Sequence, residues 1–161
     1  MAEVTLPSSG PLVGRHVRLD LLTDADADLL HPLVADSALG AAGTLVGTSS
    51  LLEATVLHEH IHLGSTLYGR AWWGTAVNPE TKLLLLAHCF EDCGYGRVKI
   101  QTDALNTRSQ AAIARLGAVR EGVLRRDMKR EDGTFRDTVV FSILGEEWAG
   151  VKAGLQARLR V

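Results

Sequence analysis

The sequence predicts one α/β (α+β) domain in which a central sheet is flanked by helices. Two patterns support this class. Some segments alternate polar and apolar residues, as strands do, and other segments repeat apolar residues at helical spacing. The two kinds of segment alternate along the chain. The chain has 161 residues, of which 46% are hydrophobic and 22% are charged. This length and composition suit a compact domain with a sizeable core. We therefore interpret residues 1–161 as a single domain.

The N-terminal part of the chain has the weakest patterns. Residues 1–11 contain two prolines and two serines and are expected to form a loose leader. Residues 15–21 alternate polar and apolar and predict the first strand. Thr23 can cap a helix that stops near Pro32, and residues 32–36 then fit either a second strand or more helix. In both interpretations the helical segment between the first two strands is short.

The rest of the chain has clear elements. Strands are predicted at residues 45–51, 59–67 and 97–102, and a hairpin follows with arms at residues 122–128 and 135–144. Helices are predicted at residues 79–93, 107–116 and 146–159. Asn106 caps the second of these helices and Gly117 ends it. The cysteines Cys89 and Cys93 lie four residues apart on one helix face, and we interpret them as small buried apolar residues.

The junction between the 59–67 strand and the next helix is the most informative stretch. Gly74, Thr75 and Ala76 have small side chains, so a ligand can approach the backbone there. Asn78 is a good N-cap and Pro79 fits the first helical position. A helix N-terminus presents unpaired N–H groups and a partial positive charge, which suit a phosphate. The junction therefore predicts a phosphate-binding turn, and the sequence lacks the P-loop and the G-x-G-x-x-G fingerprint.

Three ordered motifs resemble those of the GCN5-related N-acetyltransferases, the GNAT superfamily. Gly74-Thr75-Ala76 matches the second half of the pyrophosphate-binding loop Gln/Arg-x-x-Gly-x-Gly/Ala, and Ala71 departs from its first position. Residues 106–118 match the element Asn-x-x-Ser-x-x-x-Ile-x-x-Leu-Gly-Phe/Ala. Residues 120–125 and 133–148 then follow in an order similar to the Rim-type branch, which includes the ribosomal-protein N-terminal acetyltransferases.

This resemblance implies a mixed, largely antiparallel sheet and a CoA-dependent N-acyltransferase. It implies acetyl-CoA as the co-substrate, no metal, and a small amine or a protein N-terminus as the acceptor. Strand 59–67 is expected to splay from strand 97–102 and to bind the pantetheine arm. The expected CoA-binding residues are Leu67, Tyr68, Gly74, Thr75, Ala76, Val77, Asn78 and Asn106. Two alternatives stay open: a CoA-binding module with little or no turnover, and transfer of succinyl or another short acyl group.

Ser109 is the candidate for protonating the leaving thiolate. In GNAT enzymes a tyrosine often has this role, but this sequence has Ile113 at the corresponding position. Some Rim-type enzymes use a serine at the position that Ser109 matches. The structural alternative is that Ser109 only completes the first turn of its helix, with Asn106 as the cap.

His62 is the candidate base, because it stands where relatives often carry Glu. An imidazole has an ordinary pKa near 6.5 and can accept a proton from an amine. His58, His60 and His62 are expected to share one strand face, where they span about 13 Å. That distance is too long for one metal ion, so we predict no metal site. The alternative role for His62 is that of a polar residue on this face.

Charge and hydropathy give no sign of a nucleic-acid partner, a membrane span or a signal peptide. The net charge is −2 and the pI is about 6.3, so no overall basic field favours nucleic acid. No apolar run reaches the roughly 20 residues that cross a bilayer, and residues 1–5 lack the features of a signal peptide. We therefore expect a cytoplasmic protein without a membrane or nucleic-acid partner. Strand-edge dimers are common in similar proteins, so the resemblance leaves a homodimer open, and the sequence alone does not give the oligomeric state.

Overall fold

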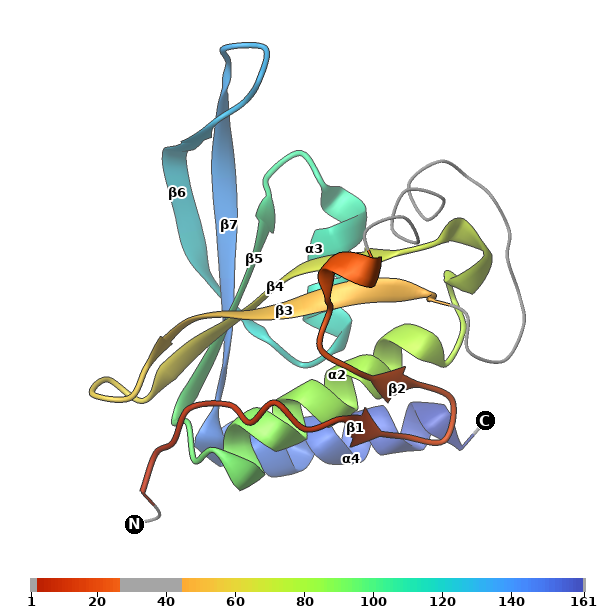
Figure 1. Cartoon of the computed structure of the whole chain (residues 1–161). Coiled ribbons are helices and arrows are strands. Elements are labelled where there is room, and N and C mark those ends of the chain that lie inside the picture. Colours follow the sequence, from red (N-terminus) through yellow and green to blue (C-terminus); the bar gives the residue numbers. More distant parts are fainter. Residues whose placement is uncertain (1–2, 27–44, 161) are drawn as a thin grey trace.

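The computed structural model describes residues 3–26 and 45–160, and Figure 1 shows a central sheet flanked by helices. The five strands of the sheet are β3 (Gly47–Thr55), β4 (His60–Tyr68), β5 (Arg97–Asp103), β6 (Val119–Lys129) and β7 (Phe135–Leu144). The helices are α2 (Val77–Ala87), α3 (Thr107–Arg115) and α4 (Trp148–Leu159). The strand order is β3-β4-β5-β7-β6, and only β4 and β5 are parallel. The predicted fold class, a mixed and largely antiparallel sheet, is confirmed.

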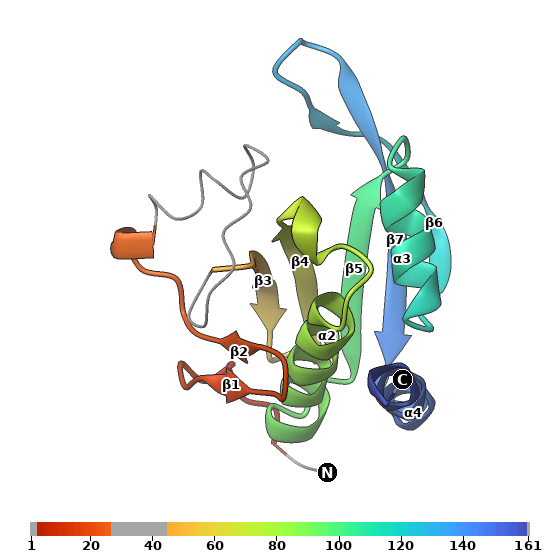
Figure 2. The ribbon, with the colours of Figure 1, turned by 90° about the vertical axis from the view of Figure 1, so that its right-hand side faces the viewer.

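The core lies where one face of the sheet packs against the helices. Ile61, Val98 and Ile143, from three neighbouring strands, are fully buried. Leu86 of α2 and Leu155 of α4 belong to the same cluster, and Figure 2 shows these two helices lying against each other. Burial of these apolar side chains holds α2 and α4 against the sheet.

The N-terminal segment differs from expectation in two respects. Within the described residues, the 15–21 segment does not join the main sheet, and only β2 (Arg18–Leu19) pairs, with β1 (Leu12–Val13). The chain turns back instead, because the N–H groups of residues 15–17 donate to the carboxylate of Glu80 on α2 at 2.6–2.8 Å.

The leader also packs against the body of the protein. The N–H of Thr5 donates to the carbonyl oxygen of Cys93 at 2.9 Å, and the N–H of Ser8 donates to Nε2 of His88 at 3.2 Å. These hydrogen bonds hold the segment in place, so the prediction of a loose leader is wrong. After Thr23 the structure describes only a short 3-10 turn at Asp24–Asp26, and the expected element at residues 32–36 lies outside the described residues.

Helix α2 begins earlier than predicted. Its first residue is Val77, and Ala76 occupies the cap position, so the prediction of Asn78 as the N-cap is wrong. The hydroxyl of Thr75 accepts a hydrogen bond from the N–H of Val77 at 3.3 Å, which satisfies one donor at the start of the helix. The helix continues as a π-helical turn at His88–Asp92. In the two described stretches, no helix is long and apolar enough to cross a membrane.

Candidate active site

The parallel pairing of β4 with β5 stops halfway along β4. It joins only His60–His62 to Arg97–Lys99, although β3 follows β4 as far as Tyr68. A register shift separates the β3 partners Thr48 and Ser50, and Ser65 opposite them has φ +47°. This bulge bends the strand. Within residues 3–26 and 45–160, the edge of β4 that faces β5 therefore has no strand partner after His62, which agrees with the splay that the family resemblance implies.

The open edge of β4 leads to the turn at residues 74–78, which we call the phosphate-binding turn. Gly74 has φ +75°, and a Cβ placed there would have no atom within 4 Å. Among the described residues, none accepts a hydrogen bond from the N–H groups of Gly74, Ala76 and Asn78. Free N–H groups at a helix start attract an anion. This open turn with unpaired donors has the features that the sequence predicts for a phosphate-binding site.

A stack of side chains stands beside this turn and was not predicted from the sequence. The guanidinium carbon of Arg108, on α3, lies 3.7 Å from the ring centroid of Trp73. The guanidinium carbon of Arg70 lies 5.7 Å from the same ring, and Nε1 of Trp73 donates to the carbonyl oxygen of Tyr68 at 3.0 Å. Cation–π contacts of this kind orient charged groups. Two positive charges are therefore held next to the phosphate-binding turn.

The ring of His62 is buried and lies over Gly64. A Cβ at Gly64 would fall only 2.7 Å from Nε2 of His62, so the glycine makes room for the ring. His62 is 5% exposed, and neither of its ring nitrogens has a hydrogen-bond partner among the described residues. Burial lowers the pKa of His62, with a further lowering by the nearby positive charges of Lys99 and Arg136, whereas Glu53 raises it. A neutral imidazole with free nitrogens can accept a proton.

Glu53 reaches this histidine from a second bulge, and no pattern in the sequence indicated it. The residue has φ +51° and lies in a register shift between Leu52 and Thr55. Its carboxylate lies 3.8 Å from Nδ1 of His62 and accepts a bond from Nζ of Lys99 at 2.5 Å. Strained residues of this kind cluster at functional sites. His62 is thus surrounded by a carboxylate from β3 and an amine from β5.

The other predicted site residues lie along the same opening. Ser109 is half-buried in the first turn of α3, and its N–H donates to the side chain of Asn106 at 2.9 Å. Asn106 is therefore the helix cap, as the structural alternative predicted. Leu67 is 41% exposed on the open end of β4. Burial raises the pKa of the neighbouring Tyr68 to about 12, so its phenol stays protonated.

The predicted histidine face is shorter than expected, because His58 lies in the turn before β4 and stacks on His60 at 6.1 Å between ring centroids. Across the described residues, no group of three His, Cys, Asp or Glu side chains is arranged to hold a metal ion.

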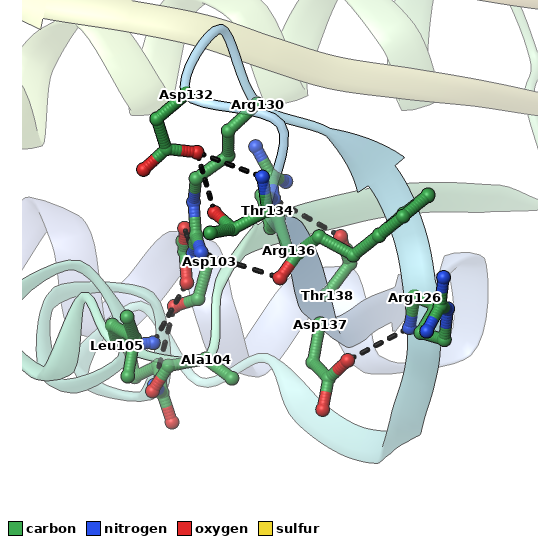
Figure 3. A network of polar contacts seen from close by, with 12 residues as sticks. Asp103, Ala104, Leu105, Arg126, Arg130, Asp132, Thr134, Arg136, Asp137 and Thr138 are labelled. Atoms are coloured by element: carbon green, nitrogen blue, oxygen red, sulfur yellow. Dashed lines mark hydrogen bonds and ion pairs between the residues drawn. The ribbon is translucent and has the colours of Figure 1, made fainter.

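The hairpin of β6 and β7 extends beyond the sheet and is tied to the end of β5 (Figures 1 and 3). Arg130 donates to Asp103 at 2.5 Å, and the N–H of Arg126 donates to Asp137 at 2.7 Å. The guanidinium carbon of Arg126 lies 4.0 Å from the ring centroid of Phe135. The positive charge of Arg126 is therefore engaged within the hairpin, and that of Arg130 is engaged by the end of β5.

The fold and this opening define the class of the protein. The Acetyltransferase (GNAT) domain family matches residues 30–119, more than half of the chain. The chain belongs to this family. Its parallel β4–β5 pair with a splayed end, and the turn at the start of α2, lie within the matched region.

Similar proteins agree with this assignment. A crystal structure from T. thermophilus, assigned to the acetyltransferases, is 36% identical, with a TM-score of 0.83 and coverage of 96% of this chain and 100% of that chain. The fold also resembles Mycobacterium smegmatis RimJ, solved in complex with CoA-disulfide, at 24% identity, a TM-score of 0.66 and coverage of 75% and 58%.

YdaF of Bacillus subtilis, assigned as a ribosomal N-acetyltransferase, is 28% identical over 110 residues, or 68% of this chain and 59% of YdaF. Its name agrees with the Rim-type branch that the motifs resemble. The chain spans 59% of YdaF and 46% of a second curated relative, an N-acetyltransferase p20 of Bacillus licheniformis whose activity is uncharacterised.

Proposed function

We propose that this chain is a CoA-dependent N-acyltransferase that moves an acetyl group from acetyl-CoA to a primary amine. The single observation that carries the proposal is the unpaired edge of β4, which leads directly to the phosphate-binding turn. Family membership supports acyl transfer. The CoA complex of RimJ, a protein of similar fold, supports this ligand class.

The backbone supplies most of the binding in this proposal. The N–H groups of Gly74, Ala76 and Asn78 hold the pyrophosphate, and the charges of Arg70 and Arg108 lie beside them. The open edge of β4, including Leu67 and Tyr68, pairs with the pantetheine arm. Acetyl-CoA supplies the activated acyl group, and the chain holds it in a fixed orientation toward the acceptor.

The proton steps fall to His62 and Ser109. The neutral imidazole of His62 accepts a proton from the attacking amine, because burial keeps its pKa below the ordinary value. Ser109, at the start of α3, donates its hydroxyl proton to the leaving thiolate. The amine nitrogen forms a bond to the acyl carbon while the carbon–sulfur bond breaks.

The acceptor is an exposed amine, either a protein N-terminus or a small molecule. The name of YdaF, a ribosomal N-acetyltransferase, supports a protein N-terminus. Mass spectrometry after incubation with acetyl-CoA and a panel of peptides and polyamines tests this, with succinyl-CoA in a parallel series. We expect an acetylated acceptor and free CoA thiol in equal amounts. CoA binding without turnover on any amine would instead establish the chain as a CoA-binding module.

A further inference from the structure

Lys82 is a buried amine that neither the family motifs nor the proposed proton steps use. It lies on α2 and is 5% exposed. Its Nζ donates to the hydroxyl of Thr66 on β4 at 2.6 Å and to the hydroxyl of Ser49 on β3 at 2.9 Å. The two hydroxyls also lie 2.8 Å apart. One amine therefore ties together three elements, and no carboxylate among the described residues pairs with it.

The partners of Lys82 lie on the two sides of the β4 bulge. Thr66 directly follows Ser65, the residue with φ +47°, and Ser49 is skipped in the register between Thr48 and Ser50. A bulge leaves its extra residue outside the strand ladder, and here the bonds from Lys82 join the two strands across it. Lys82 supplies that support at the point where β4 leaves β5.

Lys82 is also close to the phosphate-binding turn. It follows Asn78 by four residues, which places it one helical turn further along the same face of α2. Burial lowers the pKa of Lys82 to about 7, so a large fraction of its amine is neutral near neutral pH. An anion bound at the turn stabilises the ammonium form through the low-dielectric interior.

Among the described residues, no charged group on the neighbouring elements is free to pair with the ammonium of Lys82. The titratable residues on the open ends of β3 and β4, on α2 and on β2 are Tyr68, Glu80 and Arg18. The phenol of Tyr68 is neutral, the carboxylate of Glu80 is bound by backbone N–H groups, and Arg18 pairs with Asp20. In the part of the chain that the structure describes, the charge of Lys82 therefore has no carboxylate partner that an arriving anion would have to displace.

We propose that Lys82 is a positioning residue for the acyl-CoA arm, which holds the bulged end of β4 open and takes up a proton when the anionic ligand binds. The inference rests on the proposed function, because the ligand is CoA. Lys82 does not touch the reacting atoms and acts through Thr66. Part of the amine is neutral in the free protein, so binding of CoA increases the positive charge of the site.

Calorimetry with CoA as the probe tests the proposal without requiring turnover. Lys82→Met keeps the length of the side chain and leaves the Ser49 and Thr66 hydroxyls bonded to each other. We expect CoA affinity to fall at least tenfold. Measured in buffers of different ionisation enthalpy at about pH 7.5, the wild type should take up about half a proton more than Lys82→Met. Equal affinity and equal proton uptake in the two proteins would overturn the proposal.

A second variant separates the amine from its partner. Thr66→Val removes the hydroxyl and keeps Lys82, so it should weaken CoA binding, and adding Lys82→Met should add little further loss. Full additivity, or wild-type affinity in Thr66→Val, would count against the proposal. Lys152→Met is the matched control, because Lys152 bonds to Glu91 away from the opening at 2.7 Å, and it should bind CoA normally. A wild-type chain that binds no CoA would overturn the proposed function and this inference with it.

Discussion

The two ends of β4 differ in almost every property. His60–His62 is paired with β3 and β5 and carries the fully buried Ile61, whereas residues 64–68 are paired on one side only and three of their side chains are exposed. The paired end contributes Ile61 to the core, and the bulge at Glu53 lies opposite it on β3. The open end has bulged backbone, free donors and a buried amine beneath it. One half of a strand can therefore stabilise the fold while the other half keeps an edge open.

The largest expected effect is the difference in stability between one alanine substitution in each half of β4. Ile61→Ala, at a side chain with no exposed surface, should lower the free energy of unfolding by about 2–5 kcal/mol. Leu67→Ala, at a side chain that is 41% exposed, should cost less than about 1 kcal/mol but should weaken CoA binding. Urea denaturation and calorimetry measure both. Similar losses of stability in the two variants would contradict the comparison.

His62 lies at the boundary between the halves, and His62→Gln should lower kcat/KM by about 100-fold at neutral pH. In the wild type, kcat/KM should rise with pH through an ionisation below 6.5, because burial lowers the pKa of the imidazole. The variant should lack that limb. Deprotonation of the amine itself appears well above neutral pH and can be separated from it. A variant with the wild-type pH profile would remove His62 from the mechanism.

Gly74 lies in the turn that follows the open end of β4, and its substitution should weaken CoA binding. Gly74→Val puts a β-branched residue at φ +75° and obstructs the approach of the pyrophosphate, so CoA affinity should fall at least tenfold, or by about 1.4 kcal/mol. Gly133→Val is the matched control, since Gly133 has φ +84° in the β6–β7 turn and imposes a similar backbone strain. The control should bind CoA as the wild type does. Equal weakening in the two variants would indicate a general effect of strain.

Ser109→Ala should have a smaller effect, because a thiolate needs little help to leave at neutral pH. We expect kcat to fall by less than about tenfold. CoA affinity should stay constant, because the N–H of Ser109 remains bonded to Asn106. Steady-state kinetics with saturating amine measures the change. A wild-type kcat would leave Ser109 with a structural role alone.

The smallest effect concerns the paired half of the sheet. Glu121 accepts two bonds from Arg97 at 2.5 Å and one from Ser142 at 2.8 Å, and these contacts lower its pKa to about 2. A depressed carboxyl pKa stabilises the fold above the unfolded value near 4.3 and loses this contribution as pH falls toward 2. Glu121→Gln should lower the Tm slightly at neutral pH and not at about pH 2. A difference in Tm that persists in acid would contradict this assignment.

The strongly periodic elements could be predicted from the sequence. The 97–102 strand and the 107–116 helix agree with β5 and α3 to within one residue. The predicted start of α2 is two residues late, because Asn78 and Pro79 suit a cap but also fit inside a first helical turn. The 15–21 strand is wrong because its alternating pattern could not reveal that the backbone N–H groups bind Glu80.

The site was only partly predictable. The position of the phosphate-binding turn follows from local sequence, since small residues precede a helix start. The bulge at Glu53 depends on the register between two strands, and the Trp73–Arg108 stack joins residues far apart in the chain. The role of Lys82 could not be predicted, because nothing in a single sequence shows that its amine is buried.

The hydrogen bonds from the N-terminal segment to Glu80 change the electrostatics at the start of α2. A carboxylate in the first turn of α2 would compete with an incoming phosphate for the positive end of the helix. Here the N–H groups of Arg15, His16 and Val17 surround that carboxylate, and Gly14 has no side chain to keep them away. Their dipoles offset its negative charge. The backbone of residues 15–17 thus reduces the effect of the Glu80 carboxylate on the helix dipole. The positive end of α2 can then still attract an anion.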